Sequence, residues 1–151
     1  MTEDGFEGFV QQPHEGTRIR RREATIRVVV PSGRSAASSA MELEVRPGFQ
    51  TSLHSHDTVE EILYVLSGRL DFSCGDGTVS VGEGGCVVLP AGLPHRFRNP
   101  GPGTARLLMT GAPPSLDLYF AQLAGLEDGD EPAIAEVQRR HGVTIHRPAE
   151  D

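Results

Sequence analysis

Two histidines and two acids lie close together in the stretch HSHDTVEE, residues 54–61. His54 and His56 are one residue apart, so in an extended segment their imidazoles project from the same face. Glu61 begins the next apolar segment, and His95 lies in a later one. Neutral imidazoles with one carboxylate suit a borderline divalent metal and leave coordination positions open. His54, His56, Glu61 and His95 are therefore candidate ligands of one catalytic metal ion.

The spacing of these residues resembles the two sequence motifs of the cupin family. The first motif is Gly, five residues, His-x-His, three or four residues, Glu, six residues and Gly. Its positions are filled by Gly48, His54, His56, Glu61 and Gly68. The second is Gly, five residues, Pro-x-Gly, two residues, His, three residues and Asn. Its positions are filled by Gly84, Pro90, Gly92, His95 and Asn99.

The resemblance implies an all-β fold, the double-stranded β-helix or cupin jelly-roll barrel, with the metal in its interior. Carried over by position, the three histidines match the family's imidazole ligands and Glu61 its carboxylate ligand. Glu60 is the competitor, because some cupins have the shorter gap. We favour Glu61, which keeps six residues before Gly68 and shares a strand face with Leu63 and Val65.

The metal itself is left open among Fe, Ni, Mn, Cu, Co and Zn, because this ligand set accepts several ions. Three neutral ligands and one anion leave a divalent ion with net positive charge, which favours an enolate, phenolate or carboxylate donor. Glu61 is also the candidate catalytic residue, since a carboxylate can accept a proton from the incoming substrate.

The leading hypothesis for function comes from a resemblance to small quercetin-dioxygenase-like cupins. It is a metal-dependent oxygenase, an oxidoreductase acting on an enolisable or phenolic small molecule in secondary metabolism. Two alternatives use the same barrel. One is a redox-neutral lyase, isomerase or cyclase that uses the ion as a Lewis acid, and the other is a cupin that binds a small molecule without turnover.

Strands are expected through most of the chain, because apolar and polar residues alternate between frequent glycines and prolines. Met41, Leu43 and Val45, for example, alternate with charged residues. The expected strands cover about 25–30, 41–46, 60–67, 70–74, 79–81, 86–89, 95–99 and 105–109. Cys86 falls in a fully apolar run, so we expect its side chain to be small and buried.

After Pro114 the apolar spacing becomes helical, which predicts a C-terminal helical tail. Ser115 is the expected N-cap of the first helix, 130–140 the expected second helix, and 143–145 a last short strand. The first helix is expected to cap the barrel mouth as a lid, to pack on the outer wall, or to form a dimer seam. Three domain segments follow: a flexible N-terminal arm or edge segment (1–20), the barrel (21–113) and the tail (114–151).

The amino-acid composition argues against several classes of binding partner. The net charge of −7 argues against nucleic acid and anionic membranes, and no apolar stretch is long enough to span a bilayer. An acidic start without a signal peptide and only two cysteines favour a cytoplasmic protein. We expect a small-molecule substrate and, from the fold resemblance, a homodimer. His14, His141 and His146 lie outside the motifs and are expected to be solvated.

Overall fold

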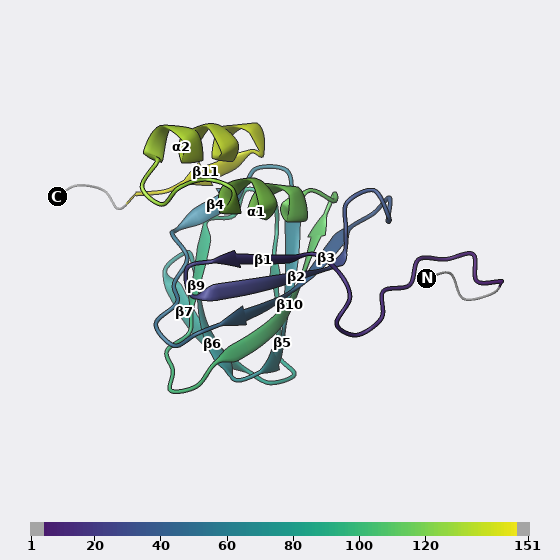
Figure 1. The fold of residues 1–151 in the computed structure, drawn as a ribbon. Coiled ribbons are helices and arrows are strands. Elements are labelled where there is room, and N and C mark those ends of the chain that lie inside the picture. The colour runs from purple at the N-terminus through teal and green to yellow at the C-terminus, as the bar shows by residue number, and fades with distance from the viewer. Residues whose placement is uncertain (1–4, 148–151) are drawn as a thin grey trace.

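Eleven strands and two helices make up residues 5–147, the part of the chain that the computed structural model describes (Figure 1). One antiparallel sheet has the order β1-β2-β3-β10-β5-β8 and the other the order β11-β4-β9-β6-β7. The first sheet contains β1 (Arg18–Arg21), β2 (Ala24–Val30), β3 (Ser39–Val45), β10 (Ala105–Ala112), β5 (Glu60–Ser67) and β8 (Cys86–Leu89). The second contains β11 (Val143–Ile145), β4 (His54–His56), β9 (His95–Arg98), β6 (Arg69–Cys74) and β7 (Gly77–Gly82). The expected jelly-roll barrel is confirmed.

The main core lies between the two sheets, and β5 shows how the sequence builds it. Glu61, Leu63 and Val65 are buried, whereas the alternate residues Ile62 and Tyr64 are exposed. The period of two therefore turns one face of the strand into the barrel and the other to solvent. All expected strands are present, most with bounds shifted by one to three residues.

Cys86 corrects one prediction, because its side chain is exposed. It lies on β8, the edge strand of its sheet, directly opposite the exposed Tyr64 on β5. A short apolar run does not say which of its residues face inward, and here Leu89 does so while Cys86 and Val88 face out.

The C-terminal tail forms α1 (Leu116–Ala124) and α2 (Glu131–Arg140), followed by β11. Ser115 occupies the N-cap of α1 as expected, but its side chain makes no capping hydrogen bond. Asp130 caps α2, since its Oδ1 accepts a hydrogen bond from the Ala133 backbone N–H at 3.3 Å.

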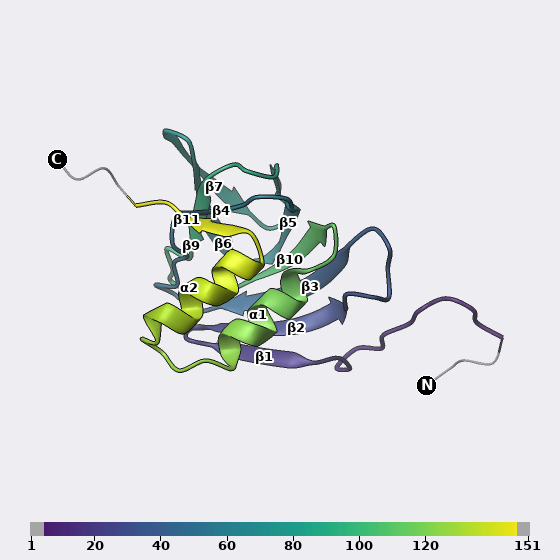
Figure 2. The ribbon, with the colours of Figure 1, turned by 90° about the horizontal axis from the view of Figure 1, so that it is seen from above.

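The C-terminal tail packs against the barrel. Helix α1 packs against β1 and β3, and α2 packs against α1 and β11. Figures 1 and 2 show both helices gathered at one end of the barrel, beside β1 and close to β4 and β11. The helices thus connect the β1 edge of one sheet with the β11 edge of the other. A second apolar cluster forms there from Tyr119, Leu123, Val137 and Val143.

Strand β1 begins at Arg18, inside the segment expected to be an arm or an edge segment, and forms the edge of its sheet by pairing with β2 along its length. Residues 5–17 form no helix or strand. The part next to β1 contacts β2, because the Val28 N–H donates to the Thr17 carbonyl at 2.8 Å and Arg27 Nη1 donates to the Glu15 carbonyl at 3.1 Å. The chain before it extends away from the barrel (Figures 1 and 2). The remaining parts of the predicted arm and tail, 1–4 and 148–151, lie outside the described residues. Neither helix within residues 5–147 has the length and hydropathy needed to cross a bilayer.

Candidate metal centre

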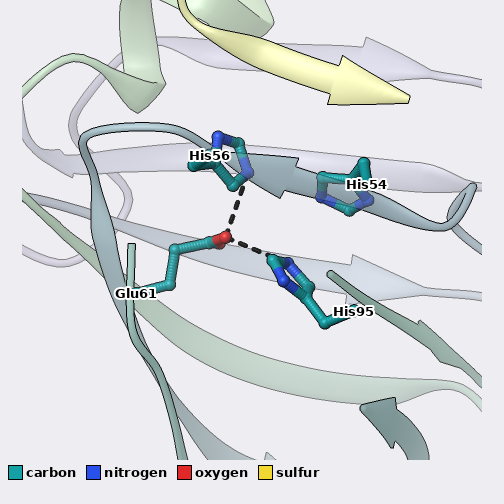
Figure 3. Close-up of side chains that lie close together, drawn as sticks. All are labelled: His54, His56, Glu61 and His95. Atoms are coloured by element: carbon teal, nitrogen blue, oxygen red, sulfur yellow. Dashed lines mark ion pairs between the residues drawn. The ribbon is translucent and has the colours of Figure 1, made fainter. Parts of the chain in front are cut away.

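Three strands from both sheets bring the predicted ligands together. His54 and His56 lie on β4, His95 on the adjacent β9, and Glu61 on β5 of the opposite sheet. His54 and His95 are directly opposite each other in the β4–β9 pair, which places their side chains on the same sheet face. Glu61 faces them from across the barrel interior (Figure 3).

The candidate ligand atoms of the four residues all lie within 4.8 Å of one another. Glu61 Oε1 is 3.0 Å from His56 Nε2 and 3.2 Å from His95 Nε2 (Figure 3). His54 completes the group, with its ring centroid 4.5 Å from that of His95. Glu60 is exposed on the outer face of β5, so Glu61 is the acid that reaches the cluster.

Backbone carbonyls orient two of the imidazoles. Nδ1 of His54 lies 2.7 Å from the Ser52 carbonyl oxygen, and Nδ1 of His95 lies 2.9 Å from that of Leu93. A carbonyl oxygen only accepts, so each Nδ1 carries the proton and donates it. In the neutral tautomer the lone pair is then on Nε2. Such contacts are the usual way in which a protein fixes the orientation of a metal-binding histidine.

The cluster fits a metal ion on its own chemistry. Glu61 Oε1 and His56 Nδ1 are buried and lack a hydrogen bond of acceptable geometry within residues 5–147. When the Nε2 atoms of His56 and His95 carry lone pairs, the negatively charged Oε1 of Glu61 lies about 3 Å from them with no proton or cation in between. Such a contact between electron-rich atoms is unfavourable in a buried site. A divalent cation held by the four side chains would remove this conflict and satisfy the carboxylate.

Burial and charge set the protonation states. Burial lowers the pKa of His54 to about 4, so its imidazole is neutral at physiological pH. Burial alone would raise the pKa of Glu61, but His56 and His95 outweigh it and lower this pKa to about 2. Burial likewise acts to lower the pKa of His95, and its contact with Glu61 raises that pKa instead. Glu61 is therefore ionised at neutral pH, and it supplies the negative charge that a divalent cation would balance.

The tail contributes a further side chain next to the ligands. Tyr119 on α1 is buried, and its ring meets that of His56 edge to face at a centroid distance of 6.2 Å. Burial raises the pKa of Tyr119, so its phenol stays protonated. The helical spacing places Tyr119 on the apolar face of α1, but it does not indicate which part of the barrel that face meets.

Two histidines expected to be solvated have partners, and the prediction for them was wrong. A hydrogen bond of 2.8 Å joins His146 Nε2 to Ser55 Oγ, between the two β4 ligands. His141 Nε2 lies 3.1 Å from Gln122 Oε1, and its ring packs against Tyr119. Both depend on how the tail folds back onto the barrel, which no local pattern reveals. His14 is exposed as expected.

Asn99 closes the second motif in a structural role. Its Nδ2 donates to the carbonyls of Val45 and Gly103, and its Oδ1 accepts from the Gly101 N–H. These bonds hold the loop that follows β9 against the end of β3, so Asn99 is not a ligand.

Several known proteins are similar to this chain in sequence or in fold. Residues 41–111 match the family model described as a cupin domain. SchB of Streptomyces halstedii is 34% identical over 122 residues, which cover 78% of this chain and 86% of that protein. The polyketide synthase CurC of Streptomyces cyaneus is 32% identical over 129 residues, covering 82% of this chain and 83% of that protein.

Among solved structures, the polyketide cyclase RemF from Streptomyces resistomycificus superposes with a TM-score of 0.61 at 26% identity. The superposition covers 69% of this chain and 80% of RemF. All four candidate ligands lie inside the matched segment 41–111, whereas Tyr119 and His146 lie beyond it.

Proposed function

The chain belongs to the cupin family, and from this membership we propose that it is a metal-dependent cyclase acting on a polyketide or a similar poly-carbonyl compound. The observation that carries the proposal is the cluster of three histidines and Glu61, of which His56, Glu61 and His95 are buried. The similarity to a polyketide synthase and to a polyketide cyclase supports the choice of substrate class. Among the expected functions, this is the redox-neutral alternative.

The chemistry needs an enolate and a group that takes up its proton. A divalent ion held by His54, His56, Glu61 and His95 would supply Lewis-acid stabilisation for the oxygens of a 1,3-dicarbonyl unit. Glu61 is the one carboxylate of the cluster and is ionised at neutral pH, as its lowered pKa requires. We assign it the acceptance of the α-carbon proton.

In the ring closure that follows, every bond, proton and oxygen atom is accounted for. The enolate carbon attacks a second carbonyl of the same chain, and one C–C bond forms while the carbonyl oxygen takes up a proton. Loss of that oxygen as water gives a conjugated ring. No oxidant or reductant is consumed, so the reaction needs only a site that folds the chain and accepts and returns a proton.

The surroundings of the cluster suit an apolar substrate. His54 is the least buried of the four residues, so solvent reaches the cluster from its side. Ile145 is paired with His54 across the β4–β11 ladder and is 37% exposed. Paired residues of an antiparallel ladder share a face, so Ile145 adds an apolar side chain beside the open end of the site.

The test is an assay with a synthetic linear poly-β-ketone thioester under strict anaerobiosis. Protein loaded with zinc or manganese should give a product one water lighter than its substrate, detected by mass spectrometry. Glu61→Gln should abolish product formation, while the matched control Glu60→Gln, which changes the exposed neighbour, should retain it. Absence of a cyclised product with every metal would refute the proposal.

An oxygenase is the second candidate function. Three neutral imidazoles and a carboxylate also suit Fe, Ni or Cu and leave open positions, which favours this function. It predicts a product that gains oxygen, together with O₂ uptake by the same sample. The mass of the product and its dependence on oxygen therefore separate the two functions in one experiment.

A further inference from the structure

Strand β4 carries two of the four candidate ligands, yet it has little pairing inside the barrel. It contains three residues, and only His54 is paired with β9, opposite His95. The one further backbone bond from the barrel side that is described for β4 is donated by the Gly92 N–H, in the loop before β9, to the His56 carbonyl at 2.8 Å. On its other side all three residues are paired with β11, through Val143–His56, Thr144–Ser55 and Ile145–His54. Most of the ladder that holds this strand therefore comes from the C-terminal tail.

Backbone bonds extend this ladder at both ends. The Asp57 N–H donates to the Gly142 carbonyl at 2.8 Å, and the His146 N–H donates to the Leu53 carbonyl at 2.9 Å. The tail is therefore hydrogen-bonded to the chain immediately before and immediately after the His-x-His segment. These bonds fix the register of the strand that carries both imidazoles.

Side-chain hydrogen bonds also join the tail to β4, on the face of β4 that points away from the site. His54 and His56 point into the site, so the intervening Ser55 points the other way and is buried at 3% exposure. There its hydroxyl is hydrogen-bonded to His146 Nε2 at 2.8 Å. Thr144 Oγ1 donates to Asp57 Oδ1 at 3.0 Å. His146 is therefore the tail side chain that contacts the residue between the two ligands.

The second apolar cluster anchors the tail itself. Val143 of β11 packs with Val137 of α2 and with Tyr119 and Leu123 of α1. Tyr119 also contacts the face of the site through its edge-to-face contact with His56. The two helices thus tie β11, and through it β4, to the body of the domain.

We propose that the C-terminal strand is part of the metal centre, and that His146 is a positioning residue that holds His54 and His56 in their binding geometry through Ser55. This inference rests on the metal-binding role within the proposed function. Residues that orient metal ligands from behind typically change metal affinity by about 10–100-fold when removed. We expect an effect of that size from His146.

The experiment measures Co²⁺ binding by full-length protein through chelator competition, with the visible spectrum of the bound ion recorded on each variant. His146→Ala should weaken binding about 10–100-fold and change the Co²⁺ bands, because β4 is less constrained. His146→Gln should restore most of the affinity, because its side-chain amide can replace either hydrogen-bonding role of the imidazole. His14→Ala, which removes an exposed histidine, is the matched control and should bind like the wild type.

Thermal unfolding of each apo variant separates positioning from loss of fold. If His146→Ala does not fold, Ser55→Ala removes the same hydrogen bond from the other partner and should give the same shift. Unchanged affinity and spectrum in the folded His146→Ala or Ser55→Ala protein would overturn the inference. A wild-type protein that binds Co²⁺ without cyclising a substrate would refute the proposed reaction alone, whereas one that binds no metal would refute both.

Discussion

Strands β4 and β5 both supply candidate ligands, but the protein holds them in different ways. Strand β5 has eight residues, lies inside its sheet, and is paired with β10 on one side and β8 on the other. Its inward residues Leu63 and Val65 are fully buried in the main core. Strand β4 has three residues and depends on the tail strand β11 for most of its pairing.

The difference separates two tasks within one site. The barrel core fixes the carboxylate of Glu61, so its position follows from the same packing that folds the domain. The histidines of β4 lie where the sheet is short, and their position is adjusted by a segment outside the matched cupin domain. Changes on the β5 side should therefore affect either the charge of the site or global stability. Changes on the β4 side should affect the geometry of the site at smaller cost to the fold.

The largest effect is expected from Glu61→Gln, which removes the charge that β5 delivers. Loss of the anionic ligand should weaken divalent metal binding by more than about 100-fold, beyond the loss caused by residues that only orient ligands. Isothermal titration with Zn²⁺ measures this change. Glu60→Gln, on the exposed face of the same strand, should bind Zn²⁺ normally. Equal affinities for Glu61→Gln and the wild type would show that β5 contributes no ligand.

The next largest effect is expected when a buried side chain on β5 is shortened. Leu63 is fully buried between the sheets, so Leu63→Ala should lower the free energy of unfolding by about 2–5 kcal/mol. Chemical denaturation of the apo protein measures the change. The neighbouring Ile62 is 39% exposed, and Ile62→Ala should cost much less. Similar losses for the two variants would contradict the assignment of the inner face.

The same contrast explains what the sequence could predict. The alternation of Glu61, Leu63 and Val65 is a local pattern, so both the strand and its inward carboxylate followed from it. The motif spacing likewise indicated the three histidines of the cluster. The roles of His146 and Tyr119 did not follow, because they depend on contacts with segments far away in the sequence: His146 reaches back 91 residues to Ser55, and Tyr119 reaches back to His56. A strand of three residues such as Val143–Ile145 is too short for its sequence to predict which other strand it pairs with.

Truncation in the second apolar cluster should cost less than truncation on β5. Val143 is buried beneath α1 and α2, and Val143→Ala removes two methyl groups, at about 0.8 kcal/mol each. We expect a loss of about 1–2 kcal/mol in the free energy of unfolding. The amides of β4 should also exchange faster with solvent, as hydrogen exchange can show. A loss as large as that of Leu63→Ala, with uniform exchange, would mean that the tail and barrel are equally rigid.

The smallest effect is expected on the outer face of the six-stranded sheet, where charges add little to what the core already fixes. Glu42 on β3 forms ion pairs with Arg27 on β2 and with Arg106 on β10, the latter at 2.8 Å. The hydrogen bond from Arg27 is the main cause that lowers the pKa of Glu42. A lowered folded-state pKa means that the ionised form stabilises the fold. This contribution is complete above the unfolded-state pKa and is lost as the pH falls through the lowered value.

Glu42→Gln should therefore cost less than about 1 kcal/mol at neutral pH and nothing in strong acid. Denaturation curves at several pH values, with the exposed Glu44→Gln as control, measure the difference. A penalty that persists in acid would show that Glu42 acts through packing and not through its charge.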